Sequence, residues 1–379
     1  MIEHYLDNAA TTKPSDAAVK AAVECLTGCY GNPSSLHRAG LRAQQAMDHA
    51  RAVIAKALGA DAREIIFTSC ATESTNMALL STAAAYGRKR RKIITSAVEH
   101  ASVKQTLTHL AETEGFEIVE IKPQENGEYS AADFINAADD NTCLITMMMV
   151  NNETGHILPV QSVFAAVKRR FPHIITHCDA VQAFMKYPVK SKTLCADFIS
   201  VSGHKIHAPK GVGALYVKKG VKLRTFIHGG KQESGRRGGT ESVPLIAAFG
   251  AAAEELLPTI DSRFEYVKGL NMKLRERLSV LSGVRILSPE NGSPYILSVI
   301  IPRIRSEIML HYLESRNVYV SSGSACSKGA GSGVPETFGA TSQEADSVIR
   351  ISLCHENNDE DIDALVSGIE AGMKEIMHR

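Results

Sequence analysis

Ser202-Gly203-His204-Lys205 directly follows a strand-like run, Ala196–Val201, and precedes a turn-rich segment, Ala208–Gly213. A lysine at the end of a buried strand is unusual, because burial lowers the pKa of an ammonium group towards neutrality. A neutral amine can attack a carbonyl carbon and hold an aldehyde cofactor as a Schiff base. A solvent-exposed lysine at a strand end explains this fragment equally well, so other segments must decide.

Strand-like and helical runs alternate around this stretch. The strand-like runs are Ile65–Ser69, Lys92–Ala97, Glu117–Ile121, Cys143–Val150, Ile174–Cys178 and Ala196–Ser202, and the helical runs are Glu73–Arg88, Ala101–Glu114, Ala131–Ala138 and Val160–Arg170. This alternation predicts an α/β fold with a mostly parallel sheet and helices on both faces. Ligands of such sheets bind beyond the carboxyl ends of the strands.

A second, smaller unit follows. It contains a long helical run from Leu257 to Leu281, a strand-like run at Tyr295–Ile301 and an amphipathic helix at Asp359–Met377. We therefore predict a large domain of residues 13–257 and a small domain of residues 1–12 and 258–379.

The composition is that of a soluble globular enzyme, with 44% apolar and 22% charged residues in 379. The formal net charge of +1 gives no reason to expect nucleic acid or a membrane surface as a partner. The chain starts without a signal peptide, so a cytoplasmic location is expected. Its eight cysteines include no Cys-x-x-Cys pair, which predicts neither a disulfide framework nor a metal site.

Polar clusters follow the predicted strands. Thr68–Ser74 opens a helix whose free amides could bind a phosphate, although an ordinary helix cap would have the same composition. Later strands are followed by Glu99-His100, by Asn151-Asn152-Glu153-Thr154-Gly155 and by Asp179-Ala180-Val181-Gln182. Because the carboxyl ends of parallel strands meet at one edge, we expect these side chains and Lys205 to form one site.

The ordered set of motifs resembles the cysteine desulfurases of the NifS/IscS type, in the class V aminotransferase family. The resemblance covers almost the whole chain. Besides the clusters above, it rests on Leu6-Asp7-Asn8-Ala9-Ala10-Thr11-Thr12, Gly31-Asn32-Pro33-Ser34-Ser35, Thr72-Glu73-Ser74, Ser202-Gly203-His204-Lys205, Gly238-Gly239-Thr240 and Ser321-Ser322-Gly323-Ser324-Ala325-Cys326.

The resemblance implies a homodimer of fold type I that depends on pyridoxal phosphate (PLP). Each subunit would have a large domain with a mostly parallel seven-stranded sheet flanked by helices, and a smaller α+β C-terminal domain. Lys205 would carry the cofactor, and Asp179 would keep the pyridinium nitrogen protonated. His100 would stack on the ring and exchange protons with the substrate.

The resemblance also implies how cofactor and substrate are held. Gln182 and Asn152 would bind the ring oxygen and the substrate, and Arg350 would pair with the substrate carboxylate. The phosphate would be bound by Ala71, Thr72, Ser202, His204 and, from the partner subunit, Thr240.

Cys326 lies in Ser-Gly-Ser-Ala-Cys-Ser-Lys-Gly-Ala-Gly-Ser-Gly, a composition that predicts a mobile loop with an exposed thiol. In the implied reaction, Lys205 removes the α-proton of L-cysteine and the Cys326 thiolate takes the substrate sulfur. The products would be L-alanine and a persulfide, whose sulfur passes to an acceptor protein of iron–sulfur cluster assembly or of a thiolation pathway.

Two other functions remain open from the sequence. One is a selenocysteine lyase or another β-eliminating or transaminating member of the family. The other is a non-catalytic relative that acts as a regulatory subunit, against which the presence of Lys205, His100, Asp179 and Cys326 argues.

The sequence departs from the family pattern in two places. Cys70 stands where the family usually has glycine, which predicts a strained backbone if that position requires glycine angles. The stretch from Cys326 to Arg350 is slightly short, and this change concerns the docking of the sulfur acceptor.

Overall fold

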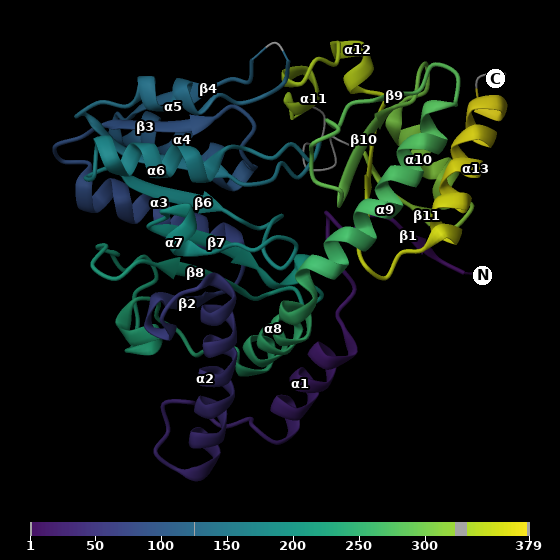
Figure 1. The fold of residues 1–379 in the computed structure, drawn as a ribbon. Helices are drawn as coiled ribbons and strands as arrows, with labels where there is room; N and C mark the ends of the chain where they lie inside the picture. Colours follow the sequence, from purple (N-terminus) through teal and green to yellow (C-terminus); the bar gives the residue numbers. More distant parts are fainter. Residues whose placement is uncertain (1, 125, 323–331, 377–379) are drawn as a thin grey trace.

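The computed structural model describes residues 2–124, 126–322 and 332–376 (Figure 1). Its main sheet has seven strands in the order β2-β8-β7-β6-β5-β3-β4. They are β2 (Ile65–Thr68), β3 (Lys92–Ser96), β4 (Glu117–Ile121), β5 (Thr142–Met148), β6 (Ile175–Asp179), β7 (Phe198–Ser202) and β8 (Gly213–Val217). All neighbours are parallel except the two pairs that β8 makes with β2 and β7. The predicted fold class is confirmed.

Helices cover both faces of this sheet. They are α1 (Asp16–Thr27), α2 (Arg38–Leu58), α3 (Ala71–Tyr86), α4 (Ala101–Glu114), α5 (Ala131–Ala137), α6 (Val160–Arg170), α7 (Ser191–Leu194) and α8 (Val243–Leu256). Consecutive strand residues point to opposite faces. Thus Ile93 packs in a cluster with residues of α3 and α4, and Ile94 packs in the larger cluster that includes α2, α6 and α8.

A second unit lies beside the large sheet, at the right of Figure 1. Its strands are β1 (His4–Tyr5), β9 (Arg285–Ile286), β10 (Ile296–Ile300), β11 (Val318–Tyr319), β12 (Ser321–Ser322) and β13 (Val348–Ser352). Four of them form an antiparallel sheet in the order β12-β13-β10-β9, and β1 pairs with β11. Its helices are α9 (Ile260–Ser279), α10 (Ser306–Glu314), α11 (Val334–Thr337), α12 (Ser342–Ala345) and α13 (Asp359–Ile376).

The N-terminal residues belong structurally to this second unit. The backbone N–H of Leu6 donates to Tyr319 O, and that of Ser352 donates to Leu6 O. The predicted domain boundary at residue 257 falls at the start of a short 3₁₀ turn, Leu257–Thr259, between α8 and α9.

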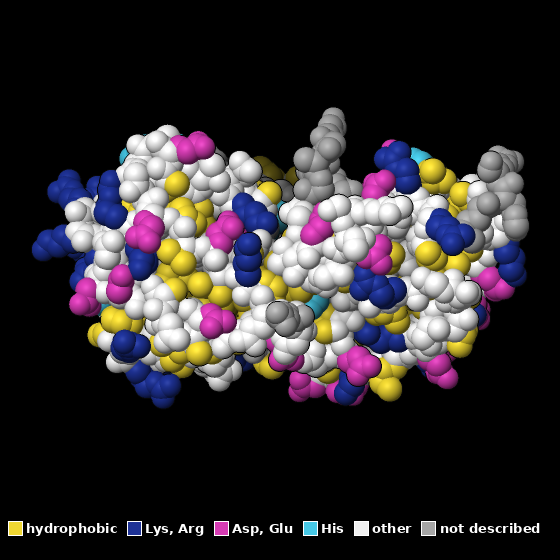
Figure 2. All heavy atoms as spheres, turned by 90° about the horizontal axis from the view of Figure 1, so that it is seen from above, with side chains coloured by type: hydrophobic (Ala, Val, Ile, Leu, Met, Phe, Trp, Pro, Cys, Tyr) yellow, Lys and Arg dark blue, Asp and Glu magenta, His cyan; other side chains and the backbone are white. Residues whose placement is uncertain are grey.

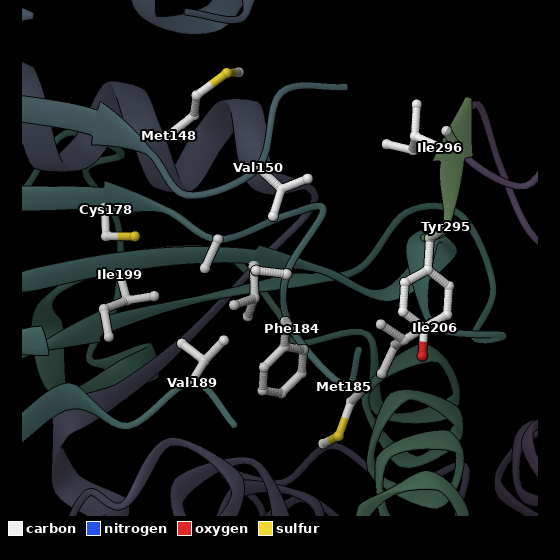
Figure 3. Close-up of a cluster of buried hydrophobic side chains, with 14 of the residues drawn as sticks. Met148, Val150, Cys178, Phe184, Met185, Val189, Ile199, Ile206, Tyr295 and Ile296 are labelled. Atoms are coloured by element: carbon white, nitrogen blue, oxygen red, sulfur yellow. The ribbon is translucent and has the colours of Figure 1, made fainter. Parts of the chain in front are cut away.

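The two units share an apolar contact. Figure 3 shows Met148, Cys178 and Ile199 on the strands of the large sheet, and Tyr295 and Ile296 on the small unit, in one cluster of buried side chains. This contact fixes the carboxyl edge of the large sheet against the small unit.

The run Val243–Ser279, which includes α8 and α9, is apolar and long enough to resemble a membrane span. However, α8 packs against α1 and α2, and its side chains Ile246 and Phe249 are buried. The apolar composition of this run therefore reflects packing inside the protein.

The outer surface carries both signs of charge. Figure 2 shows acidic and basic side chains mixed across the face seen from above, as expected from a formal net charge of +1. This face shows no broad field of one sign that would attract a polyanion.

Candidate active site

A cavity of about 620 Å³ lies between the carboxyl edge of the large sheet and the small unit. This volume lies in the range of pockets that bind cofactors and small substrates. The large unit contributes the predicted residues Ala71, Thr72, His100, Asn152, Asp179, Gln182, Ser202, His204 and Lys205 to the lining, and the small unit contributes Arg350.

Lys205 ends the 3₁₀ turn Gly203–Lys205 that directly follows β7. The turn needs glycine at position 203, because a Cβ there would lie 2.8 Å from Cγ1 of Val212. The Lys205 ammonium donates hydrogen bonds to Ala9 O at 2.5 Å and Ala10 O at 2.6 Å. The N-terminal segment therefore holds the amine at the cavity wall.

The start of α3 forms a potential anion-binding site, here called the anion seat, on another wall of the cavity. Its N-cap residue, Cys70, provides no side-chain cap, so the first amides of the helix face the cavity with their positive dipole end. Ser202 is 1% exposed, and its Oγ has no hydrogen-bond partner. Buried hydroxyl groups are nearly always paired, so this oxygen indicates a missing acceptor such as a phosphate.

The same seat requires a glycine on the neighbouring strand. A Cβ on Gly213, which opens β8, would lie 2.8 Å from Cys70 C and 3.1 Å from Ala71 N. Cys70 itself has φ −173° and ψ 169°, which is extended backbone open to any residue. The expected strain at Cys70 is therefore absent, and its side chain lines the cavity.

Asp179 ends β6 and lies on the cavity floor with 6% of its surface exposed. Burial raises the pKa of its carboxyl group, and the charges of His100 and Lys205 and the N–H of Val181 oppose this rise. An acidic group in this position is suited to pairing with a cationic ring nitrogen.

His100 is the N-cap residue of α4, and its Nδ1 accepts a hydrogen bond from the N–H of Ser102 at 3.1 Å. In the neutral imidazole the proton therefore lies on Nε2. His100 lines the cavity and can donate or accept a proton there.

Arg350 lies on β13 and is 6% exposed. Its Nη2 donates to Asp7 Oδ1 at 2.9 Å and its Nη1 to Asn152 O at 3.1 Å, whereas its buried Nε has no partner. Asp7 and Asn152 orient the guanidinium group, and the unpaired N–H remains for an acidic ligand.

The chain matches the family model "Aminotransferase class-V" over residues 4–365. It belongs to this family. It is 40% identical over 370 residues to a protein of Nostoc sp. named cysteine desulfurase, which covers 96% of this chain and 90% of that protein.

Solved structures of the family have the same fold. One named "NIFS-LIKE PROTEIN" superposes with a TM-score of 0.93 at 36% identity, covering 98% of this chain and all of the other. Another, SspA in complex with cysteine, has a TM-score of 0.82 at 32% identity, covering 93% of this chain and 99% of the other. The resemblance that the sequence motifs indicated is thereby confirmed.

Two predicted site residues are not among those that line the described cavity. Cys326 falls outside the described residues. Thr240 is exposed and does not line the cavity, so its role at the partner's site stays a prediction.

The sequence analysis assigned no role to Glu99, although it lines the cavity and is 3% exposed. Its Oε1 accepts hydrogen bonds from Ser96 Oγ at 2.5 Å and Met148 N at 2.9 Å, and its Oε2 has no partner. Burial raises the pKa of this carboxyl group from 4.5 to about 8. Glu99 is therefore mostly protonated at neutral pH.

Glu99→Gln should make stability less dependent on pH, because glutamine mimics the protonated acid. A raised pKa means that the stability contributed by Glu99 is fully present below pH 4.5 and is lost as the pH rises through about 8. We expect the melting temperature of the variant, relative to wild type, to rise steadily between about pH 5 and 8. The exposed control Glu112→Gln should show no such trend. If the difference in melting temperature between Glu99→Gln and wild type stayed constant across this pH range, the raised pKa of Glu99 would be contradicted.

Proposed function

We propose that this protein is a PLP-dependent cysteine desulfurase, which converts L-cysteine to L-alanine and retains the sulfur as a persulfide on Cys326. The observation that carries the proposal is the arrangement around one cavity of Lys205, Asp179 and His100 next to an unpaired anion seat. Each of these groups serves a different part of the cofactor or the reaction.

The residues present fit pyridoxal phosphate. Lys205 would bind its aldehyde carbon, Asp179 its ring nitrogen, and His100 its ring face. The amides of Ala71 and Thr72, with Ser202 and His204, would bind its phosphate. When bound, the cofactor supplies an electron sink for the bonds broken at the substrate α- and β-carbons.

The neighbours of His204 favour a neutral side chain. Burial, followed by the charges of Lys205 and Lys210, lowers the pKa of its imidazole to about 4. At physiological pH the imidazole of His204 is therefore neutral before a phosphate binds, and it can donate one hydrogen bond to that group.

The orientation of Gln182 is fixed by a lysine that the sequence analysis did not identify. The buried ammonium of Lys186 donates to Gln182 Oε1 at 3.0 Å, and Gln182 Nε2 donates to Ala9 O at 2.9 Å. Because the Ala9 carbonyl can only accept, the amide nitrogen of Gln182 faces Ala9 and the amide oxygen faces Lys186, which leaves the second N–H for another neighbour. This orientation suits an anionic oxygen on the cofactor ring.

Lys186→Met is expected to weaken PLP binding about two- to tenfold, since burial lowers the pKa of Lys186 to about 7 and a hydrogen bond from a partly charged group contributes roughly 0.5–1.5 kcal/mol. The Kd is measured by titrating PLP into cofactor-free protein and following absorbance. Lys192→Met, which removes an exposed lysine a short distance along the chain, is the matched control. An unchanged Kd in Lys186→Met would show that Gln182 does not need this orientation.

In the proposed reaction, each of four residues has a separate role. Arg350 binds the substrate carboxylate and thereby directs the α-hydrogen and the thiol group. The Nζ of Lys205 would remove the α-proton of the bound substrate. His100 holds a proton at Nε2 for the departing groups. The Cys326 thiolate accepts the substrate sulfur, and L-alanine forms when the β-carbon is protonated.

The family assignment does not favour the alternative functions. A selenocysteine lyase would use the same cavity but would not need a thiol acceptor, and a non-catalytic relative would not need the full set of acid and base groups. The names of the relatives also support the desulfurase.

A second copy of this chain and an acceptor protein are the proposed partners. Apolar side chains gather near α1 and the start of α2 on the outside of the molecule: Leu26, Tyr30, Leu36 and Leu41 are 63%, 76%, 105% and 55% exposed. Such a group of exposed apolar side chains suits a protein interface. We propose that a homodimer covers it and brings Thr240 to the partner's site.

The proposed function is tested by a single turnover with L-cysteine in the absence of reductant. We expect wild type to form alanine and to gain roughly 32 Da, one sulfur atom, on the peptide that contains Cys326. Cys326→Ala should lose both, whereas Cys195→Ala should retain them. Equal alanine formation by Cys326→Ala would exclude Cys326 as the acceptor and would favour a lyase.

A further inference from the structure

A second, much smaller cavity of about 20 Å³ lies behind Lys205. It has room for one water-sized particle. Its lining includes His207, from the segment after β7, and Cys354 and His355, from the segment after β13. The donor atoms of these three side chains all lie within 4.8 Å of one another.

We propose that His207, Cys354 and His355 bind a thiophilic closed-shell metal ion, Zn²⁺ or Cu⁺, between the large and small units. Thiolate and imidazole are the donors that these ions prefer. Tetrahedral coordination requires donor atoms roughly 3.3–3.7 Å apart, so the three donor atoms must move about 1 Å closer to one another when the ion binds. This inference is independent of the proposed desulfurase activity.

His207 is oriented as metal-binding histidines usually are. Its Nδ1 lies 3.0 Å from Lys13 O, and a carbonyl oxygen can only accept, so Nδ1 carries the proton. The lone pair is then on Nε2, and the backbone carbonyl fixes the ring, as outer-shell partners do around metals. The residue also has φ +60°, a left-handed conformation that is uncommon for residues other than glycine.

The other two donors are a buried thiol and a partly buried imidazole. Cys354 is 6% exposed, and burial raises the pKa of its thiol to about 12, opposed by backbone N–H groups of Glu356 and Asn357 that approach the sulfur. These N–H groups would stabilise the thiolate once a metal displaces the thiol proton to solvent. His355 lies edge-on to His207, with ring centroids 4.8 Å apart.

The charged neighbours of the cluster have both signs. Arg263, Lys186 and Lys205 line the cavity and oppose a cation, whereas the carboxylates of Glu255 and Glu356 attract one. The Cys354 thiolate would neutralise one positive charge of the bound ion. Cysteine spacing predicted no metal site, because two of these three ligands are histidines and His207 is distant in sequence from the others.

Co²⁺ titration of the PLP-loaded, full-length protein tests the site, because thiolate-bound tetrahedral cobalt absorbs at longer wavelength than the cofactor. The background is Cys326→Ser, so that this thiol does not bind the ion. We expect one equivalent of Co²⁺, displaced by Zn²⁺. Binding should be lost in Cys354→Ser, weakened at least about tenfold in His355→Gln, and unchanged in the matched control Cys29→Ser.

His355→Gln protects the test against misfolding, since His355 is only partly buried and Cys354→Ser could unfold the protein. If Co²⁺ gives no thiolate band, Cu⁺ is offered in competition with a chromogenic chelator. The site would be supported for the monovalent ion if the protein with His355 intact kept one Cu⁺ against the chelator and the His355→Gln variant lost it. Cobalt bands that survive both substitutions, or the absence of binding by either ion, would overturn the proposal.

Discussion

Lys205→Ala is expected to lower kcat for L-cysteine by at least about 10³-fold. The side chain is proposed both to hold the cofactor and to move the α-proton, and proton transfer alone contributes roughly 10²–10⁴-fold. Hydrogen bonds to Ala9 O and Ala10 O hold the amine at the cavity wall. Among the described residues, Lys104 is the one other lysine that lines this cavity. Initial rates of alanine formation measure this effect.

Lys192→Ala is the matched control, because Lys192 is an exposed lysine that does not line the described cavity. It should retain wild-type kcat. Cofactor content is measured in parallel, so that loss of binding and loss of proton transfer can be separated at saturating PLP. A Lys205→Ala variant that keeps more than about a tenth of the wild-type kcat would contradict the proposed role.

Arg350→Lys is expected to raise the KM for L-cysteine roughly 10- to 150-fold with a smaller change in kcat. A hydrogen bond between charged groups contributes about 1.5–3 kcal/mol, and lysine cannot offer the fork of donors that arginine offers. Lysine keeps the positive charge opposite Asp7, so the buried carboxylate is not left unpaired. Steady-state kinetics on the PLP-loaded variant measure this effect.

Cysteamine, which lacks the carboxylate, separates a substrate contact from a general loss of structure. Wild type should bind cysteamine more weakly than L-cysteine, and Arg350→Lys should have lost most of that preference. An equal loss of affinity for both compounds would show that Arg350 does not bind the carboxylate.

The sequence predicted the parts of the molecule that depend on local pattern. Strand runs such as Lys92–Ala97 and Ile174–Cys178 match β3 and β6 to within a residue, because a buried parallel strand is a short, mostly apolar run. Polar residues directly after these strands, such as His100 and Asp179, line one cavity because parallel strands end at one edge.

The sequence analysis missed features that arise from packing between distant segments. The strand β8 follows a turn-rich segment and lies antiparallel between β2 and β7, so the alternation of strands and helices does not predict it. Glu99 and Lys186 are charged residue types that are usually exposed, and only their burial next to the cavity indicates a role. The pairing of Asp7 with Arg350 could not be predicted, because the two residues are distant in the sequence and meet only where β13 lies beside the N-terminal segment.

The most direct measurement of the central claim is the product ratio from L-cysteine under reducing conditions. With PLP-loaded enzyme and a thiol reductant that releases the persulfide sulfur, we expect alanine and sulfide in equal amounts, and neither product from Lys205→Ala. Pyruvate and ammonia in place of alanine would indicate β-elimination and would contradict a desulfurase. The absence of any product from L-cysteine, despite bound cofactor, would show that this cavity acts on a different amino acid.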